Sequence, residues 1–435
     1  MKHRIKNPYF ALSQLNKKSG KYTLRILLWI ALLVPFLPKP MLAQVMSLDS
    51  VIATIDQRNP MLQEYDEKVK ALNEYSRGAT SWMAPMVGVG TFMTPYPNQT
   101  VMHESDKGAW MFSLEQEIPN PGKLKANRKF LESKADVENE GRRIQLNLLR
   151  SQAKSYYFQW LVAEKKMRVL QENEEIVALM LKLARIRYPY NQGSLGNIYK
   201  TEGRQAEVQN MIEMTQGDID DKRVRLKALM NLPQQDSLMV DTSTVVDEDF
   251  TRIRIDTADL SSRSDISQID ETIRTMRLNQ QLQRSQAKPG FRIRFDHMQP
   301  IGDMPKQFTA MAMVSIPIAP WSSKMYKAEI KGMEYGIEAM QQKREGILVE
   351  TKGMVAGMSS QLMRMKTQLK NYESKIIPAL RKNYQAVMLA YEENREQLPV
   401  VIDAWEALNM SQLEHLNKLG EYYNMIVTYE KELER

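Results

Sequence analysis

Two pairs of adjacent methionine and histidine residues, Met102-His103 and His297-Met298, are the side chains best suited to hold a ligand. Thioether and imidazole groups bind soft ions such as Cu(I). However, the chain has 30 methionines and only 4 histidines, and Met358 and Met365 fall at the spacing of a helical core. Methionine commonly fills gaps in such cores. We therefore expect structural methionines, no bound metal and no cofactor.

Catalytic motifs are absent from the sequence. It contains no P-loop, no GxGxxG, no GxSxG and no HExxH zinc motif. It also has no cysteine, which excludes thiol catalysis and thiolate metal ligands. The sequence therefore predicts that the protein is not an enzyme.

The most regular polar pattern is the alternation of charged and apolar residues over 291–296. Successive side chains of a strand point to opposite faces. One face would carry Arg292, Arg294 and Asp296, and the aromatic and aliphatic residues between them would form the other. This pattern fits a transmembrane barrel strand with its apolar face in lipid and the three charged residues in the lumen. A half-buried strand of a soluble sheet fits it equally well.

Four such strands are expected, over 83–95, 108–118, 290–298 and 307–317. Four strands cannot close a barrel with a lumen, because about eight is the smallest number that can. If the strands span a membrane, several chains must contribute, and a homotrimer would supply twelve.

The N-terminus predicts a secreted protein. Residues 1–43 contain a basic stretch, an apolar run and a small residue at the candidate cleavage point, as in a signal peptide. They carry eight of the 60 Lys and Arg residues and no acid, so the remaining bases balance the 52 Asp and Glu residues. A balanced mature chain gives no reason to expect nucleic-acid binding.

The strands belong to two copies of one plan, about 200 residues apart. Each copy has a helix, two strands, a very long helix and a returning helix. We assign a first repeat to 44–235, a linker or equatorial segment to 236–259 and a second repeat to 260–435. The opening helix of the first copy is expected over 48–81, and the long helices over 122–188 and 322–391.

The long helices show the spacing of coiled coils. Apolar residues recur every three or four positions in the first of them, at Leu149, Ala153, Tyr156, Trp160, Ala163, Met167 and Leu170. A seam of this period makes a helix supercoil against its neighbours. Helices of this length extend about 100 Å, which suits a rod better than a compact globule. Pro378 is expected to kink or interrupt the second one.

Several ordered motifs resemble those of the TolC family of outer-membrane factors. The stretch Leu48–Ile52 leading to Asn59-Pro60 resembles the family's first helix, and Phe112–Leu124 resembles the strand-to-helix junction of the CzcC- and CusC-like heavy-metal branch. Ile376-Ile377-Pro378 resembles the approach to the periplasmic tip. The resemblance extends over essentially the whole chain after residue 43.

The resemblance implies a mainly helical fold with a small β part. A TolC-like α-helical barrel of long coiled coils would continue a trimeric, 12-stranded barrel in the outer membrane of a Gram-negative bacterium. The protein would be a passive efflux duct for metal cations or small toxic compounds. Its tips, at Tyr190, Gly193 and Asn394, would dock on a periplasmic adaptor and an inner-membrane pump of the resistance-nodulation-division type.

The resemblance also implies a constricted entrance just after the second tip. Asp403 falls at one position that an aspartate occupies in TolC, and Val400 replaces the other. Glu202 takes the matching place in the first copy, and Tyr391 is expected to join the closed-state network. A ring of acids at a narrow mouth concentrates cations.

Two other functions remain open at this stage. The chain could be the outer-membrane duct of a type I protein secretion system, or a coiled-coil scaffold without a pore. The strand that alternates Arg with Phe argues against the scaffold.

Overall fold

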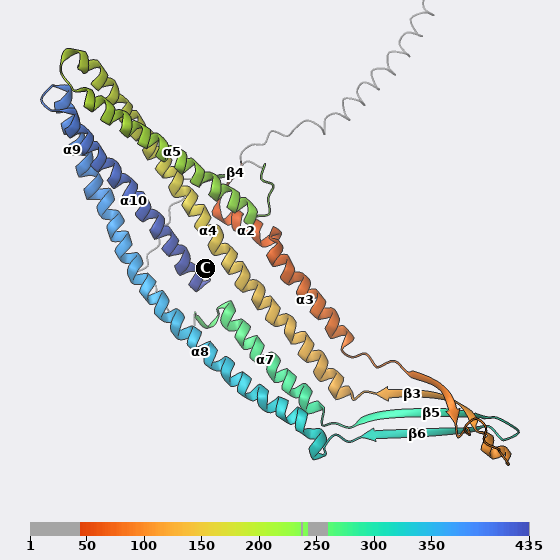
Figure 1. Ribbon diagram of the computed structural model, residues 1–435. Coiled ribbons are helices and arrows are strands. Elements are labelled where there is room, and N and C mark those ends of the chain that lie inside the picture. The colour runs from red at the N-terminus through yellow and green to blue at the C-terminus, as the bar shows by residue number, and fades with distance from the viewer. Residues whose placement is uncertain (1–43, 236–237, 242–259, 435) are drawn as a thin grey trace, which may run out of the picture.

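The computed structural model describes residues 44–235, 238–241 and 260–434. The signal peptide expected over 1–43 and most of the segment 236–259 lie outside these residues. Within them, the chain forms a long rod of helices with a small sheet at one end (Figure 1). None of the helices in the described part of the chain combines the length and apolar character that crossing a membrane requires.

The two halves of the chain contain the same order of main elements. The first half consists of β1 (Gln44–Met46), α2 (Leu48–Arg58), α3 (Pro60–Gly78), β2 (Met86–Phe92), the short helix η2 (Glu104–Lys107), β3 (Ala109–Ile118), α4 (Pro121–Arg187), η3 (Tyr188–Tyr190) and α5 (Leu195–Leu229). The second half consists of β4 (Leu238–Val240), α7 (Ser264–Ser285), β5 (Gly290–Pro300), β6 (Gln307–Ser315), α8 (Pro320–Asn371), the π-helix η4 (Tyr372–Ile376), α9 (Ile377–Glu392) and α10 (Leu398–Leu433).

The helices lie side by side in one layer, in the same order as the strands. The four-stranded antiparallel sheet has the order β2-β3-β5-β6. The helices attached to these strands contact one another in the order α3, α4, α7, α8 (Figure 1). Toward the far end, α5, α4, α10 and α9 continue this order. The layer therefore has two outer edges, one along β2, α3 and α5 and the other along β6, α8 and α9.

The predicted coiled-coil seam forms the core of the layer. All of its first seven residues except the half-buried Tyr156 are buried. In the second long helix, buried residues of the seam include Thr351, Val355, Met358 and Leu362. One apolar cluster occupies the middle of the rod and a second lies near the tips.

The opening helix expected over 48–81 is in fact two helices. Asn59 is both the C-cap of α2 and the N-cap of α3. Its backbone N–H caps the end of α2, and its side-chain Oδ1 accepts a hydrogen bond from the Met61 N–H at 2.9 Å. Pro60 follows at the first helical position, where its missing N–H costs nothing. The Asn59 amide also donates to the carbonyl oxygen of Leu229, at 2.8 Å. This bond joins the start of α3 to the end of α5.

The second long helix is interrupted before Pro378. Proline removes one backbone hydrogen bond and its ring crowds the carbonyl four residues earlier. The chain accommodates this with the π-helix η4, in which the N–H of Ile377 bonds to the oxygen of Tyr372, five residues before it. Helices α8 and α9 therefore remain one continuous rod with a local irregularity, rather than a helix broken by a sharp kink.

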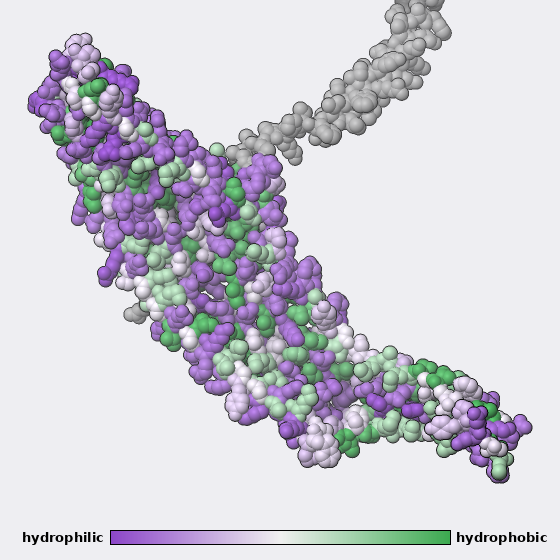
Figure 2. Space-filling model, in the orientation of Figure 1, coloured by the Kyte–Doolittle hydropathy of each residue, from purple (hydrophilic) through white to green (hydrophobic). Residues whose placement is uncertain are grey.

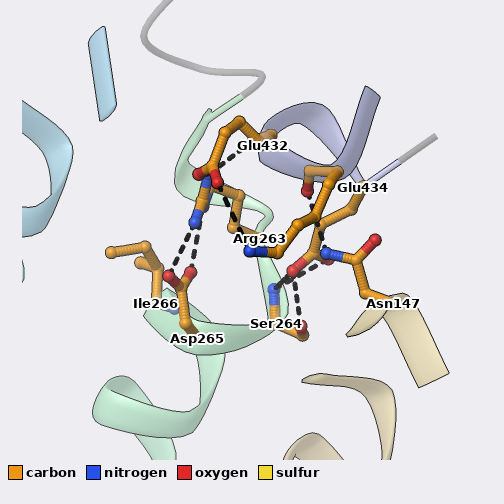
Figure 3. A network of polar contacts seen from close by, with 8 residues as sticks. Asn147, Arg263, Ser264, Asp265, Ile266, Glu432 and Glu434 are labelled. Atoms are coloured by element: carbon orange, nitrogen blue, oxygen red, sulfur yellow. Dashed lines mark hydrogen bonds and ion pairs between the residues drawn. The ribbon is translucent and has the colours of Figure 1, made fainter. Parts of the chain in front are cut away.

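A polar network joins the end of the C-terminal helix α10 to the start of α7 (Figure 3). The Glu434 carboxylate accepts hydrogen bonds from the N–H and hydroxyl of Ser264, at the first residue of α7. Arg263 lies between the carboxylates of Glu432, at 3.0 Å, and Asp265, at 2.8 Å. The end of α10 is thus held against the start of α7, as the end of α5 is held against the start of α3.

Arg263 controls the pKa of Asp265 in this network. Burial alone would raise the pKa of Asp265, but the hydrogen bond and charge of Arg263 bring it below its ordinary value. A depressed carboxyl pKa contributes stability above the pKa of the unfolded chain. We expect this contribution to be lost as pH falls below about 4, through the folded-state pKa.

We predict that Arg263→Gln lowers the free energy of unfolding by about 2 kcal/mol at neutral pH, because two carboxylates lose their cation. Arg143→Gln is the control, since Arg143 forms an exposed pair with Glu140 within one helix. Unfolding of the detergent-solubilised protein, followed by circular dichroism, measures both. The difference between the two variants should vanish at acidic pH. Equal stability at neutral pH would contradict the role of the network.

Candidate functional site

The sheet carries an ion-paired face. Arg292, Arg294 and Asp296 share this face, as the alternation predicted, with carboxylates of β3 opposite them. Arg292 Nη1 lies 3.1 Å from Oε1 of Glu115, and Arg294 Nε lies 2.9 Å from Oδ1 of Asp296. Glu117 pairs with Arg292 at 3.8 Å. Glu115 and Glu117 were not among the predicted lumen residues, although the same alternation over 113–117 places them on this face.

The opposite face is apolar and open to solvent in the single chain. Ten of its large apolar side chains are at least 45% exposed: Val87, Val89, Trp110, Phe112, Leu114, Phe291, Ile293, Phe295, Phe308 and Val314. Hydrophobic residues are conspicuous over the strands in Figure 2, whereas the helical rod is largely hydrophilic on the visible side. Soluble monomers rarely expose so large an apolar surface, which marks contact with lipid or another protein.

The strand ends differ slightly from the predicted ones. β2 covers only Met86–Phe92 of the predicted 83–95, and β5 continues to Pro300 rather than ending at 298. β6 ends at Ser315 rather than 317, because the chain turns toward α8.

The side chains of His297 and Met298 lie on opposite faces of the sheet. His297 lies on the apolar face, with its ring 6.4 Å from that of Phe112. Met298 points to the ion-paired face, opposite Met111. Neighbouring strand residues cannot converge on one ion. In the described part of the chain, no three His, Asp or Glu side chains gather as metal ligands would.

Each tip is built around an asparagine in the left-handed conformation. Asn191 and Asn394 have φ values of 58° and 59°. The N–H of Asn191 bonds to the oxygen of Tyr188, and that of Asn394 bonds to the oxygen of Tyr391. Tyr391 therefore corresponds to Tyr188, two residues before the predicted tip residue Tyr190. Asn394 likewise corresponds to Asn191 rather than to Gly193.

The predicted tip residues have different surroundings. Tyr190 is 74% exposed. Gly193 lines a pocket of about 370 Å³ between the two tips, together with Tyr391. The pocket also contains residues that precede α5 and α10, such as Ser194 and Gln397.

Arg187 fastens the two tips to each other. Its guanidinium donates to the backbone oxygens of Tyr391, at 2.7 Å, and Glu392, at 3.0 Å. It also stacks on the Tyr391 ring, 4.2 Å from its centroid. Burial raises the pKa of the Tyr391 phenol, and the Arg187 charge opposes this only in part. Nothing in the sequence marks Arg187, because its partners lie on a helix about 200 residues away.

The two acids expected at the entrance lie apart and have separate partners. Asp403 is 3.2 Å from Lys200 Nζ, and Glu202 is 2.7 Å from Arg185. Counted from the helix caps Ser194 and Gln397, Lys200 is the counterpart of Asp403. Glu202 was therefore wrongly matched to Asp403.

We predict that Arg187→Met loosens the second tip. Two charge-assisted hydrogen bonds are lost, at a cost of about 1.5–3 kcal/mol each. Amide hydrogen exchange over 389–395 should become faster than in the native protein. Arg185→Met, which removes an exposed pair beside Arg187, is the control and should leave that segment unchanged. Equal exchange in the two variants would show that Arg187 does not hold the tips together.

Comparisons with known proteins agree with this architecture. Residues 51–232 match the family model of the outer membrane efflux protein. A comparison with curated protein sequences finds no significant match.

Solved structures match over nearly the whole chain. VceC, an outer membrane protein of Vibrio cholerae, matches with a TM-score of 0.68 and 12% identity over 89% of this chain and 95% of VceC. CusC matches with a TM-score of 0.70 and 15% identity over 91% and 96%. The open MtrE outer membrane channel of Neisseria gonorrhoeae matches with a TM-score of 0.67 and 15% identity over 89% and 88%.

These matches confirm the predicted fold class, a TolC-like arrangement of long helices with a small β part, here the four-stranded sheet β2-β3-β5-β6. The matched proteins are channels rather than enzymes. The chain therefore has the fold of the outer-membrane channels, and its first half carries the sequence signature of the outer membrane efflux protein family.

Proposed function

We propose that this protein is the outer-membrane channel of a tripartite efflux system. Three copies would form a passive duct from the periplasm to the cell exterior. The observation that carries this proposal is the four-stranded sheet, which exposes one apolar face and pairs its charges on the other.

The open edges of the sheet support a homotrimer. Among the described residues, β2 and β6 each pair on one side only. Unpaired strand edges cannot remain in lipid, because each free N–H and C=O there costs several kcal/mol. β2 of one copy would pair with β6 of the next, giving twelve strands, with Arg292, Arg294 and Asp296 in the lumen. The helices keep the order of the strands, so they would close into a tunnel below.

The dimensions of the sheet fit a membrane. The ten residues of β3 rise about 33 Å, or about 25 Å along the membrane normal at a tilt near 40°. Exposed aromatic residues mark both ends: Trp110 and Phe308 lie at the distal end, and Trp82 and Trp321 lie beside the helices. Such belts occur at both interfaces of outer-membrane barrels.

The rest of the assembly follows from this placement. The tips at Tyr190, Gly193 and Asn394 would meet a periplasmic adaptor, which joins the duct to an inner-membrane pump of the resistance-nodulation-division type. The junction at Phe112–Leu124, which resembles that of the heavy-metal branch, supports metal cations as substrates, beside small toxic compounds. The duct itself supplies no energy and no catalysis.

Two adjacent substitutions in β6 test the membrane face. Ala310→Arg places a charge on the apolar face and should cost about 2–4 kcal/mol near the middle of the bilayer. Thr309→Arg places the same charge on the opposite face, across from Asp296, and should be tolerated. The amount of heat-dissociable trimer in the outer-membrane fraction measures both effects. Equal amounts from the two variants would contradict the assignment of faces.

Conductance in planar bilayers tests the entrance. Because Lys200 partly neutralises Asp403, Lys200→Gln should increase cation preference and block by divalent cations, and Asp403→Asn should decrease both. Asp49→Asn, at an exposed position in α2, is the control. If neither tip variant differs from the control, Asp403 and Lys200 do not line the entrance.

A further inference from the structure

Six lysines surround the rod where the strands become helices. All six are exposed, and none forms an ion pair within the described chain. We call this set the basic belt, and it consists of Lys123, Lys125, Lys129, Lys288, Lys324 and Lys327.

The basic belt is unusual because it opposes the helix dipoles. Both α4 and α8 begin at this level, and neither has an acid in its first turn. Acidic side chains are the ones favoured at the positive N-terminal end of a helix. The first acids of the two helices are Glu132 and Glu329, beyond most of the lysines. Glu132 pairs with Arg128, and therefore does not neutralise the belt.

Two of the lysines line a cavity of about 470 Å³ at the strand–helix junction. Lys123 and Lys288 contribute ammonium groups, and Asn120 and Ser285 contribute uncharged polar groups. The Lys288 ammonium lies directly over Gly122, where an added Cβ would come within 2.5 Å of Nζ. Glu117 is the only acid in the lining of this cavity, and it also pairs with Arg292.

The level of the belt indicates its partner. Trp82 and Trp321, 58% and 85% exposed, lie at the same junction, where tryptophan marks a membrane–water interface. On the proposed placement in the outer membrane, this is the periplasmic leaflet. We infer that the basic belt binds the phosphate headgroups of anionic phospholipids of that leaflet. This inference rests on the proposed function, and it adds a lipid preference that the channel fold alone does not require.

Quenching of tryptophan fluorescence by brominated lipid tests the inference on the full-length protein in vesicles. Trp29→Phe/Trp110→Phe leaves Trp82 and Trp321 as the exposed tryptophans of the described chain, because Trp160 and Trp405 are 1% and 2% exposed. Vesicles of phosphatidylcholine with brominated phosphatidylglycerol give the relative affinity of the two lipids. We expect the protein to prefer phosphatidylglycerol over phosphatidylcholine by about fivefold. This is the difference in affinity that one basic side chain near an anionic headgroup produces.

The decisive variant, in the same background, is Lys123→Gln/Lys288→Gln/Lys324→Gln, which should reduce the preference to about onefold. The matched control, Lys343→Gln/Lys352→Gln/Lys382→Gln, removes three exposed lysines of α8 and α9 and should retain it. An equal preference in both variants overturns the inference. Loss of the preference for phosphatidylglycerol on adding millimolar inorganic phosphate at constant ionic strength also overturns the inference. The basic belt would then be a site for free anions.

Membrane insertion is measured separately with Trp29→Phe/Trp82→Phe/Trp321→Phe, in which Trp110 is the exposed reporter. Quenching of Trp110 by brominated phosphatidylcholine supports the membrane placement on which the inference depends. Absence of this quenching contradicts the proposed function itself, whereas quenching without headgroup preference contradicts only the lipid site.

Discussion

The constraint on which the whole structure depends is that its secondary structure forms a single layer with two open edges. Strands β2-β3-β5-β6 and the helices attached to them keep one common order. A layer one element thick cannot bury both of its faces. In the part of the chain that the structure describes, the sheet leaves its apolar face exposed, and its two outer strands leave backbone groups unpaired on one side. Both problems disappear if copies of the chain join edge to edge in lipid, and the same closure makes the helices enclose a bore.

The rod reaches its length by joining helices end to end. α4 alone has 67 residues, or about 100 Å. Beside it, α5 is held against α3 by Asn59, and α10 is held against α7 by Glu434 and Arg263. At the tips, Arg187 connects the two hairpins of one chain. Movements of the tips would therefore involve both hairpins together, with η4 as an irregular segment of the adjoining rod.

Periodicity alone was sufficient to predict the main elements, because local pattern determines them. The seam from Leu149 to Leu170 and the alternation over 291–296 both match the structure. Features that depend on distant contacts could not be read in this way. The break at Asn59 is stabilised by Leu229, the pair of β1 and β4 joins residues nearly 200 positions apart, and Asp403 meets a lysine of the other hairpin. The correspondence of the two tips could not be read in this way either, because the feature they share is a left-handed asparagine, Asn191 in one and Asn394 in the other.

Disulfide cross-linking between strand edges tests the central claim most directly. The chain has no cysteine, so pairs with one cysteine in β2, at Val87 or Val89, and one in β6, at Ala310, Ala312 or Val314, are free of background. Within one copy these strands are three spacings apart, about 14 Å, which is too far for a disulfide. We expect one register to give covalent dimers and trimers in the outer membrane. Failure of every pair to link two copies would contradict the closure of the sheet between chains.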